Sequence, residues 1–308
     1  MGSLKALFLV SGAVIGMTSL VQAADLLPPP PPMEPAPMVS QEFSGWYLRG
    51  DVGVGVQTGN LGPSVSPNPL IGAPADAFNS FYNPSLSASA LFDLGVGYQI
   101  NNWLRFDVTG EYRGGSHFQA LEQIGIPSQG YQNANFYRGD VSSIIGLVNG
   151  YVDIGTWYGI TPFVGAGVGF ANNRISGLTD TGFTYPGTTI PGGFIGGPGS
   201  PTGGYFSDGS KTSFAWALMT GLDFNVTENL KLELGYRYLD YGKIKSGSSN
   251  CFNGTGAGGG FSLANCGGSG NFLSTKELTS SDFRLGLRWM FADTPTYEPA
   301  PQPLVRKY

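Results

Sequence analysis

The chain has 308 residues, enough for one large all-β domain or two ordinary ones. Only 12% of the residues are charged, whereas 49 are glycine and 13% are aromatic, a mixture that suits strands and turns rather than a helical enzyme. The net charge of −5 gives no support to nucleic-acid binding.

The N-terminal region, residues 1–23, has the features of a secretory signal peptide. Lys5 is the only charge before the apolar run ALFLVSGAVIGMTSLV, and small residues follow at 21–23. We therefore expect cleavage after Ala23, with an uncleaved membrane anchor as the alternative. No later stretch approaches the roughly 18 consecutive apolar residues of a spanning helix. A membrane-spanning form of the remaining chain could therefore only be a β-barrel.

Residues 24–44 form a proline-rich spacer, which favours an extended polyproline II conformation. Further along, Cys251 and Cys266 lie in a glycine-rich stretch, and export would favour a disulfide between them. These two thiols and the distant His117 fall short of a usual metal-ligand set. His117 is expected to be a surface residue in a loop. We expect no metal and no cofactor.

Eight segments between residues 45 and 291 alternate apolar and polar side chains, as strands with two different faces do. They cover residues 45–57, 87–100, 103–113, 142–154, 161–171, 214–226, 230–242 and a last segment that contains 284–291. Three of the connections are short. The other four are predicted to be long structureless loops, at residues 58–86, 114–141, 171–212 and 243–276. Short turns at one rim and long loops at the other are typical of outer-membrane barrels.

Alternation alone allows a soluble sandwich, with the apolar faces inside, or a membrane barrel, with these faces towards lipid. The polar faces carry nearly balanced charge, as a narrow lumen requires because unpaired buried charges are costly. Aromatic residues gather near both strand ends, as membrane-interface belts do. Glycines lie mostly on the polar face. We therefore predict that Asp153 faces the lumen beside a charge network of Arg49, Asp51, Asp93, Arg105, Asp107, Glu111, Arg113, Asp223, Lys231, Glu233, Arg237, Asp282, Arg284 and Arg288.

The segments GWYLRGDVGVG, TPFVGAGVGFA, LELGYRY and FRLGLRWMF resemble the small outer-membrane β-barrel surface proteins of alphaproteobacteria, related in architecture to the OmpA membrane domain. The similarity covers about residues 45–291. It implies an eight-stranded antiparallel transmembrane β-barrel and recognition of the last strand by the barrel-assembly machinery, through Gly286, Trp289 and Phe291. Such barrels usually end at the final phenylalanine, whereas here residues 292–308 follow, which we interpret as a periplasmic tail.

We find no catalytic constellation and predict that the protein is not an enzyme. The leading hypothesis is a structural outer-membrane protein that supports envelope integrity, with extracellular loops, both termini periplasmic, and lipid and lipopolysaccharide around the barrel. Related family members imply covalent attachment to peptidoglycan through Ala24, with an unattached tail as the alternative. Two other functions stay open: a surface-binding module, as adhesin, antigen or haem binder, and a small-conductance channel.

Overall fold

The computed structural model describes residues 44–58, 61–66, 72–185, 200–254, 261–264 and 271–291. The predicted signal peptide, spacer and C-terminal tail lie outside these residues, apart from residue 44. The chain divides into two units, Met1–Gln41 and Glu42–Tyr308, and every described residue belongs to the second. Within the described part of the chain, no helix has the length and hydropathy to span a membrane.

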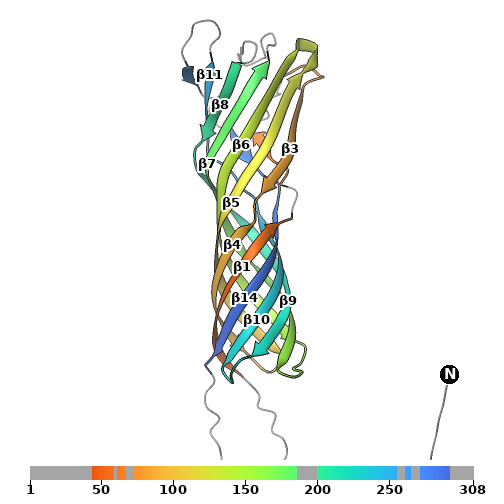
Figure 1. The fold of residues 1–308 in the computed structure, drawn as a ribbon, viewed down its shortest axis with the longest axis vertical. Coiled ribbons are helices and arrows are strands. Elements are labelled where there is room, and N and C mark those ends of the chain that lie inside the picture. Colours follow the sequence, from red (N-terminus) through yellow and green to blue (C-terminus); the bar gives the residue numbers. More distant parts are fainter. Residues whose placement is uncertain are drawn as a thin grey trace, which may run out of the picture. The chain divides into compact units, whose positions relative to one another are not determined.

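Eight antiparallel strands close into a ring (Figure 1). Around the ring the order is β1, β4, β5, β6, β7, β9, β10 and β14, and pairing of β14 with β1 completes it. The bounds are β1 (Gly45–Gln57), β4 (Ser89–Gln99), β5 (Leu104–Ile126), β6 (Tyr131–Asp153), β7 (Ile160–Tyr185), β9 (Gly209–Asn225), β10 (Leu230–Gly242) and β14 (Leu278–Met290). The prediction of an eight-stranded antiparallel barrel is confirmed.

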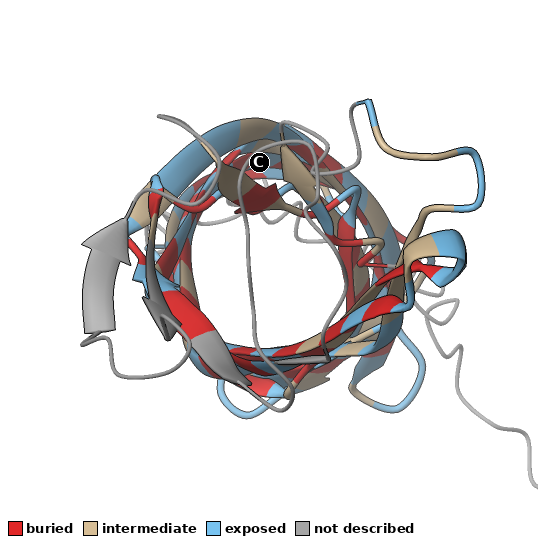
Figure 2. Ribbon diagram, turned by 90° about the horizontal axis from the view of Figure 1, so that it is seen from above, coloured by how far each residue is buried: buried red, intermediate tan, exposed pale blue. Residues whose placement is uncertain are grey.

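Burial alternates along the ring strands (Figure 2), and the exposed positions carry apolar side chains. Leu94 on β4 and Leu285 on β14 are about half exposed, at 58% and 46%, whereas the neighbouring Asp93 is fully buried. Successive side chains of a strand point to opposite faces, so the polar set shares the inside of the ring. This is the inverted arrangement that a barrel in lipid requires.

Strands β5, β6 and β7 continue far beyond the ring (Figure 1). The expectation of structureless loops at 114–141 and 171–212 is therefore wrong. β5 and β6 form a long hairpin closed by the short 3-10 helix η1 (Pro127–Gln129). Gly115 and Gly177 have φ of +76° and +59°, and each lies at a register shift where its strand gains one residue. These glycines form β-bulges, so the strands bend and continue instead of ending.

The other two expected loops, 58–86 and 243–276, also contain strands, so that expectation is corrected too. The added strands in these two segments are β2 (Ser64–Ser66), β3 (Phe78–Leu86), β11 (Ser249–Gly254), β12 (Phe261–Ala264) and β13 (Phe272–Ser274), and β8 (Ser200–Phe206) lies in the expected loop 171–212. β3 pairs with β5, while β8, β11 and β12 follow β7. We call this extension the platform: β3, β8, β11, β12, β5 after Gly115, β6 before Val141 and β7 after Ile175.

An apolar core lies beside the polar lumen of the ring, on the inner side of the platform. The small β2–β13 sheet joins it through Leu273, and the Lys276 amide donates to the Leu61 carbonyl over 2.8 Å. The core includes Leu61, Leu86, Phe118, Tyr137, Val141, Ile175, Leu178, Phe206, Ile244, Leu273 and Leu278. The same cluster continues into the ring through Ile145, Leu147, Phe163 and Met219, so the apolar interior of the platform merges with the ion-paired interior of the ring.

Candidate functional site

The lumen near the short-turn rim is organised around Arg49 of β1. Its guanidinium donates to both carboxylate oxygens of Asp51, over 2.9 and 3.0 Å, and to Asp107 over 3.1 Å. It also reaches Glu233 over 2.8 Å and the Tyr151 hydroxyl over 2.9 Å. A planar fork of five N–H donors suits this multiple pairing, which spreads one cation over three carboxylates.

Arg105 of β5 lies in the same region and is completely buried. Its Nε donates to Asp153 over 3.2 Å, and its Nη1 lies 3.5 Å from Glu233. The guanidinium also stacks over the rings of Tyr151 and Phe163, at 4.2 and 4.7 Å from their centroids. Arg105 thus fills the lumen with a cation that has both carboxylate and aromatic partners.

Arg113 and Arg237 form a second cluster farther from the short-turn rim. Arg113 donates to Glu111 over 2.9 Å and to Asp282 over 2.7 Å. Arg237 contacts the same two carboxylates over 2.5 and 2.6 Å. Two cations and two anions therefore alternate in one compact group, which offsets the cost of burying each charge.

Arg284 adds Asp93 to the first cluster. Its Nη2 donates to Asp51 over 2.9 Å and to Asp93 over 2.7 Å, and Asp51 is the partner of Arg49. Arg288 contacts Asp223. The structure thus brings every residue of the predicted network into an ion pair except Lys231, which is half-buried and has no ion pair in the described part of the chain.

Three uncharged residues belong to the network although they were not among its predicted members. The Tyr47 hydroxyl donates to Asp107 over 3.0 Å, and Asn149 donates to the same carboxylate over 2.7 Å. Tyr151 accepts from Arg49, as described above. All three are on the polar faces of the predicted strands. That position was the one sequence feature that could have indicated a place in the lumen. Partners across a lumen depend on strand stagger, which a single sequence does not reveal.

Glycines leave the space that the long side chains occupy. A Cβ at Gly286 would lie 2.1 Å from Oδ1 of Asp51, and one at Gly97 would lie 2.3 Å from the ring of Tyr47. Gly286 therefore has a packing role in the lumen, besides its predicted place in the assembly signal. Trp289 points outwards, and the amide of Phe291 donates to the Trp46 carbonyl over 2.9 Å.

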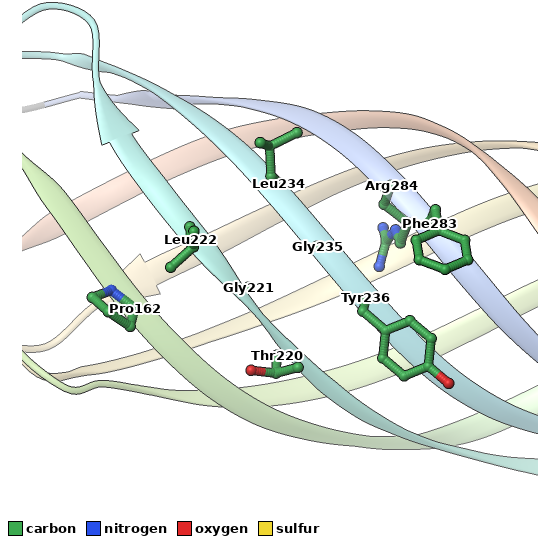
Figure 3. Close-up of a pocket in the computed structure, with 9 residues that line it drawn as sticks. All are labelled: Pro162, Thr220, Gly221, Leu222, Leu234, Gly235, Tyr236, Phe283 and Arg284. Atoms are coloured by element: carbon green, nitrogen blue, oxygen red, sulfur yellow. The ribbon is translucent and has the colours of Figure 1, made fainter.

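The outer wall has a shallow apolar groove of about 440 Å³ over β7, β9, β10 and β14 (Figure 3). Leu222, Leu234, Tyr236 and Phe283 line it, whereas the charged end of Arg284 contacts Asp51 and Asp93 in the lumen. The groove faces outwards among the exposed apolar residues. It belongs to the lipid-facing surface and has no chemistry of its own.

The remaining predicted residues lie apart from the lumen. His117 is on β5 and not in a loop, because β5 continues past its bulge; it is exposed, and its Nδ1 lies 2.6 Å from Asp140. Cys251 is on β11, but Cys266 is outside the described residues, so the disulfide stays a prediction. Ala24 is also outside them.

A closed ring with an apolar outer wall and an ion-paired interior defines a membrane-spanning β-barrel. The chain belongs to the outer membrane protein beta-barrel domain family, whose model matches residues 33–291. The resemblance seen in the strand sequences is thereby confirmed, and the family is one of outer-membrane proteins.

The chain is similar to several bacterial proteins in sequence and to several solved outer-membrane proteins in structure. An uncharacterized protein of Brucella abortus is 30% identical over 237 residues, covering 73% of this chain and 78% of the relative. A Rickettsia conorii protein named "Putative adhesin" is 29% identical over 219 residues, covering 68% and 73%. Neisserial surface protein A is 17% identical, with a TM-score of 0.33 and coverage of 81% and 100%. OprG from Pseudomonas aeruginosa is 10% identical, with a TM-score of 0.39 and coverage of 81% and 97%.

Proposed function

We propose that the protein is a surface-binding module: a sealed barrel in the outer membrane that holds the platform outside the cell. The observation that carries this proposal is the continuation of β5, β6 and β7 beyond the ring into a sheet whose inner side is buried in an apolar core. With the platform outside the cell, the short turns at the other end of the barrel and both termini are periplasmic. Lipopolysaccharide would surround the barrel where its outer face turns polar, near His117 and Asp140.

The outer face of the platform is suited to contact another molecule. Tyr82, Phe136 and Phe183 are 45%, 50% and 61% exposed, and Leu121 lies between Tyr82 and Phe136 in the strand register. These side chains lie on the far side of the polar residues His117 and Asp140 from the apolar wall, so lipid does not cover them. Apolar groups grouped on a surface in water often mark an interaction site. The adhesin name of the Rickettsia relative supports the same role.

A free strand edge lies beside the row of outward side chains formed by Tyr82, Leu121 and Phe136. β3 pairs with β5, and no second strand pairs with β3 among the residues that the structure describes. An unpaired edge presents backbone N–H and C=O groups to which an extended segment can add. The row of aromatic side chains and the edge of β3 together form the proposed binding surface.

Adhesion of whole cells tests the proposal. Cells expressing the protein should bind cultured host-cell monolayers more than a deletion strain does, and the double variant Phe136→Ser with Phe183→Ser should lose most of that difference. Thr181→Ser, an outward residue of the same sheet, is the matched control and should bind as the unchanged protein does. Equal binding by the deletion strain would contradict the surface-binding role.

The envelope-structural role and the tether at Ala24 remain predictions. Mass spectrometry of digested peptidoglycan should detect a muropeptide joined to the Ala24 amine if the tether exists. A purified cell wall without such a peptide would exclude covalent attachment. Detergent sensitivity of the deletion strain, restored by the barrel without its platform, would favour the structural role over surface binding.

A further inference from the structure

A buried carboxylate lies inside the platform, outside the ring. Glu122 of β5 is 1% exposed, and its Oε1 accepts from Asn79 Nδ2 over 2.8 Å. Its Oε2 accepts from Asn135 Nδ2 over 3.1 Å and from the Tyr137 hydroxyl over 2.6 Å. Three hydrogen bonds from strands β3 and β6 therefore hold this one carboxyl group in place. All three donors are uncharged, so the negative charge has no cation among them.

A second carboxyl group lies beside the first. Asp180 of β7 is opposite Tyr137 in the β6–β7 register and opposite Gly204 in the β7–β8 register. Its Oδ1 is shielded from solvent and has no hydrogen-bond partner in the described part of the chain. The Tyr137 hydroxyl already donates to Glu122, so it has no proton left for Asp180.

The groups that face this pair come from every strand packed around it. β3 contributes Asn79 and Phe81, β6 contributes Asn135 and Tyr137, and β8 contributes Gly204 and Phe206, whose ring lies 6.0 Å from that of Tyr137. Burial, and then the charge of Glu122, raise the pKa of Tyr137 well above its usual value, so this phenol stays protonated. Among the described residues, Glu122 is the charged group that acts on Asp180.

We propose that Asp180 and Glu122 form an acid-sensitive latch that tightens the platform when the medium becomes mildly acidic. Proton uptake by Asp180 removes the repulsion between the buried Glu122 carboxylate and the partly buried Asp180 carboxylate, and it gives Asp180 an O–H donor. Consistent with this, burial and, after it, the Glu122 carboxylate raise the pKa of Asp180 to about 7. The latch requires only the platform, whatever the platform binds.

The direction of the effect follows from linkage between proton binding and folding. With its pKa raised, Asp180 in the closed platform holds a proton at pH values where an open, solvated Asp180 has lost it. This stabilisation of the closed platform over the open one is complete below the ordinary aspartate pKa, and it is lost as the pH rises through about 7. The closed-to-open ratio of β7 should therefore fall by roughly 30-fold from about pH 5.5 to about pH 8.5.

Hydrogen exchange of the full mature chain in lipid nanodiscs tests the latch. Exchange rates are corrected for the intrinsic effect of pH, and peptides from residues 178–183 and 119–124 are compared with peptides from residues 230–238 in the ring. The platform peptides should lose protection as the pH rises, whereas the ring peptides should not. Platform protection that stays constant over this pH range would overturn the proposal.

Two variants change the titration in different ways. Asp180→Asn removes the titrating carboxyl group and should abolish the pH dependence of platform protection. Glu122→Gln removes only the second cause of the raised pKa of Asp180, after burial, so it should shift the loss of protection to lower pH. Asp208→Asn, in the exposed Arg174–Asp208 pair, is the matched control and should retain it. Gel mobility before and after boiling confirms that each variant has a folded barrel. If Asp180→Asn retained the pH response, or if Glu122→Gln left it at the same pH, another group would carry it and the proposal would fail.

Discussion

Arg237 on β10 donates to Glu111 on β5, over 2.5 Å, from diametrically opposite positions of the eight-stranded ring. Arg105 and Glu233 join the same two strands 3.5 Å apart, nearer the short-turn rim. Side chains from opposite walls therefore meet in the lumen at two levels. An eight-stranded barrel has an interior just wide enough for side chains to fill, and here ion pairs fill it.

The first prediction concerns the stability of this crossing. Arg237→Met removes one of the two cations that Glu111 and Asp282 share and leaves one excess buried negative charge, so it should cost about 3–5 kcal/mol of unfolding free energy. Urea unfolding in lipid vesicles measures the cost. Adding Glu111→Gln restores charge balance and should recover part of the loss. A double variant no more stable than Arg237→Met would show that charge pairing is not the cause.

The second prediction concerns conductance. Because opposite walls touch, the unchanged protein should show no steady current in planar lipid bilayers. Replacing both opposite-strand pairs by alanine, at Arg237, Glu111, Arg105 and Glu233, should open a small steady conductance if the variant still folds by gel mobility. Steady current through the unchanged protein would instead support the channel hypothesis and contradict a sealed lumen.

The third prediction tests which face meets lipid. Val148 is on the outer face halfway along the ring part of β6 and is 56% exposed. Val148→Arg should destabilise the folded barrel by about 2–4 kcal/mol, the cost of arginine near the bilayer midplane. Ser142→Arg, on the same face near the polar His117–Asp140 pair, should cost much less. Similar costs for the two variants, measured by urea unfolding in vesicles, would contradict the assigned lipid band.

The ring was predictable because one physical rule applies along its whole length. Residues such as Glu111 and Arg237 alternate with apolar neighbours at period two, so the sequence places them on one face before any partner is known. Their inward direction followed from charge balance and aromatic position. The identity of each partner did not follow, because strands β5 and β10 meet through a stagger that alternation does not encode.

The platform was not predictable for two physical reasons. Gly115 and Gly177 looked like loop residues, but they form bulges that shift the inward positions by one residue. Directly after the bulge in β5 the sense of the pattern also inverts: Phe118 is buried inside and His117 is exposed outside, as in a soluble protein. A strand that changes both phase and polarity of its pattern resembles an irregular loop in a single sequence.

The last prediction tests the bulge in β5. Gly115 has φ of +76°, where a β-branched residue is strained, so Gly115→Val should destabilise the platform by about 1–2 kcal/mol. Gly110→Val is the matched control, because Gly110 is on the outer face of the same strand with open space at its Cβ position. Gly115→Val should therefore increase hydrogen exchange in residues 116–126 while gel mobility still reports a folded ring. Gly110→Val should change neither measurement. If the two variants behaved alike, the conformation at Gly115 would not be what directs β5 from the barrel wall into the platform.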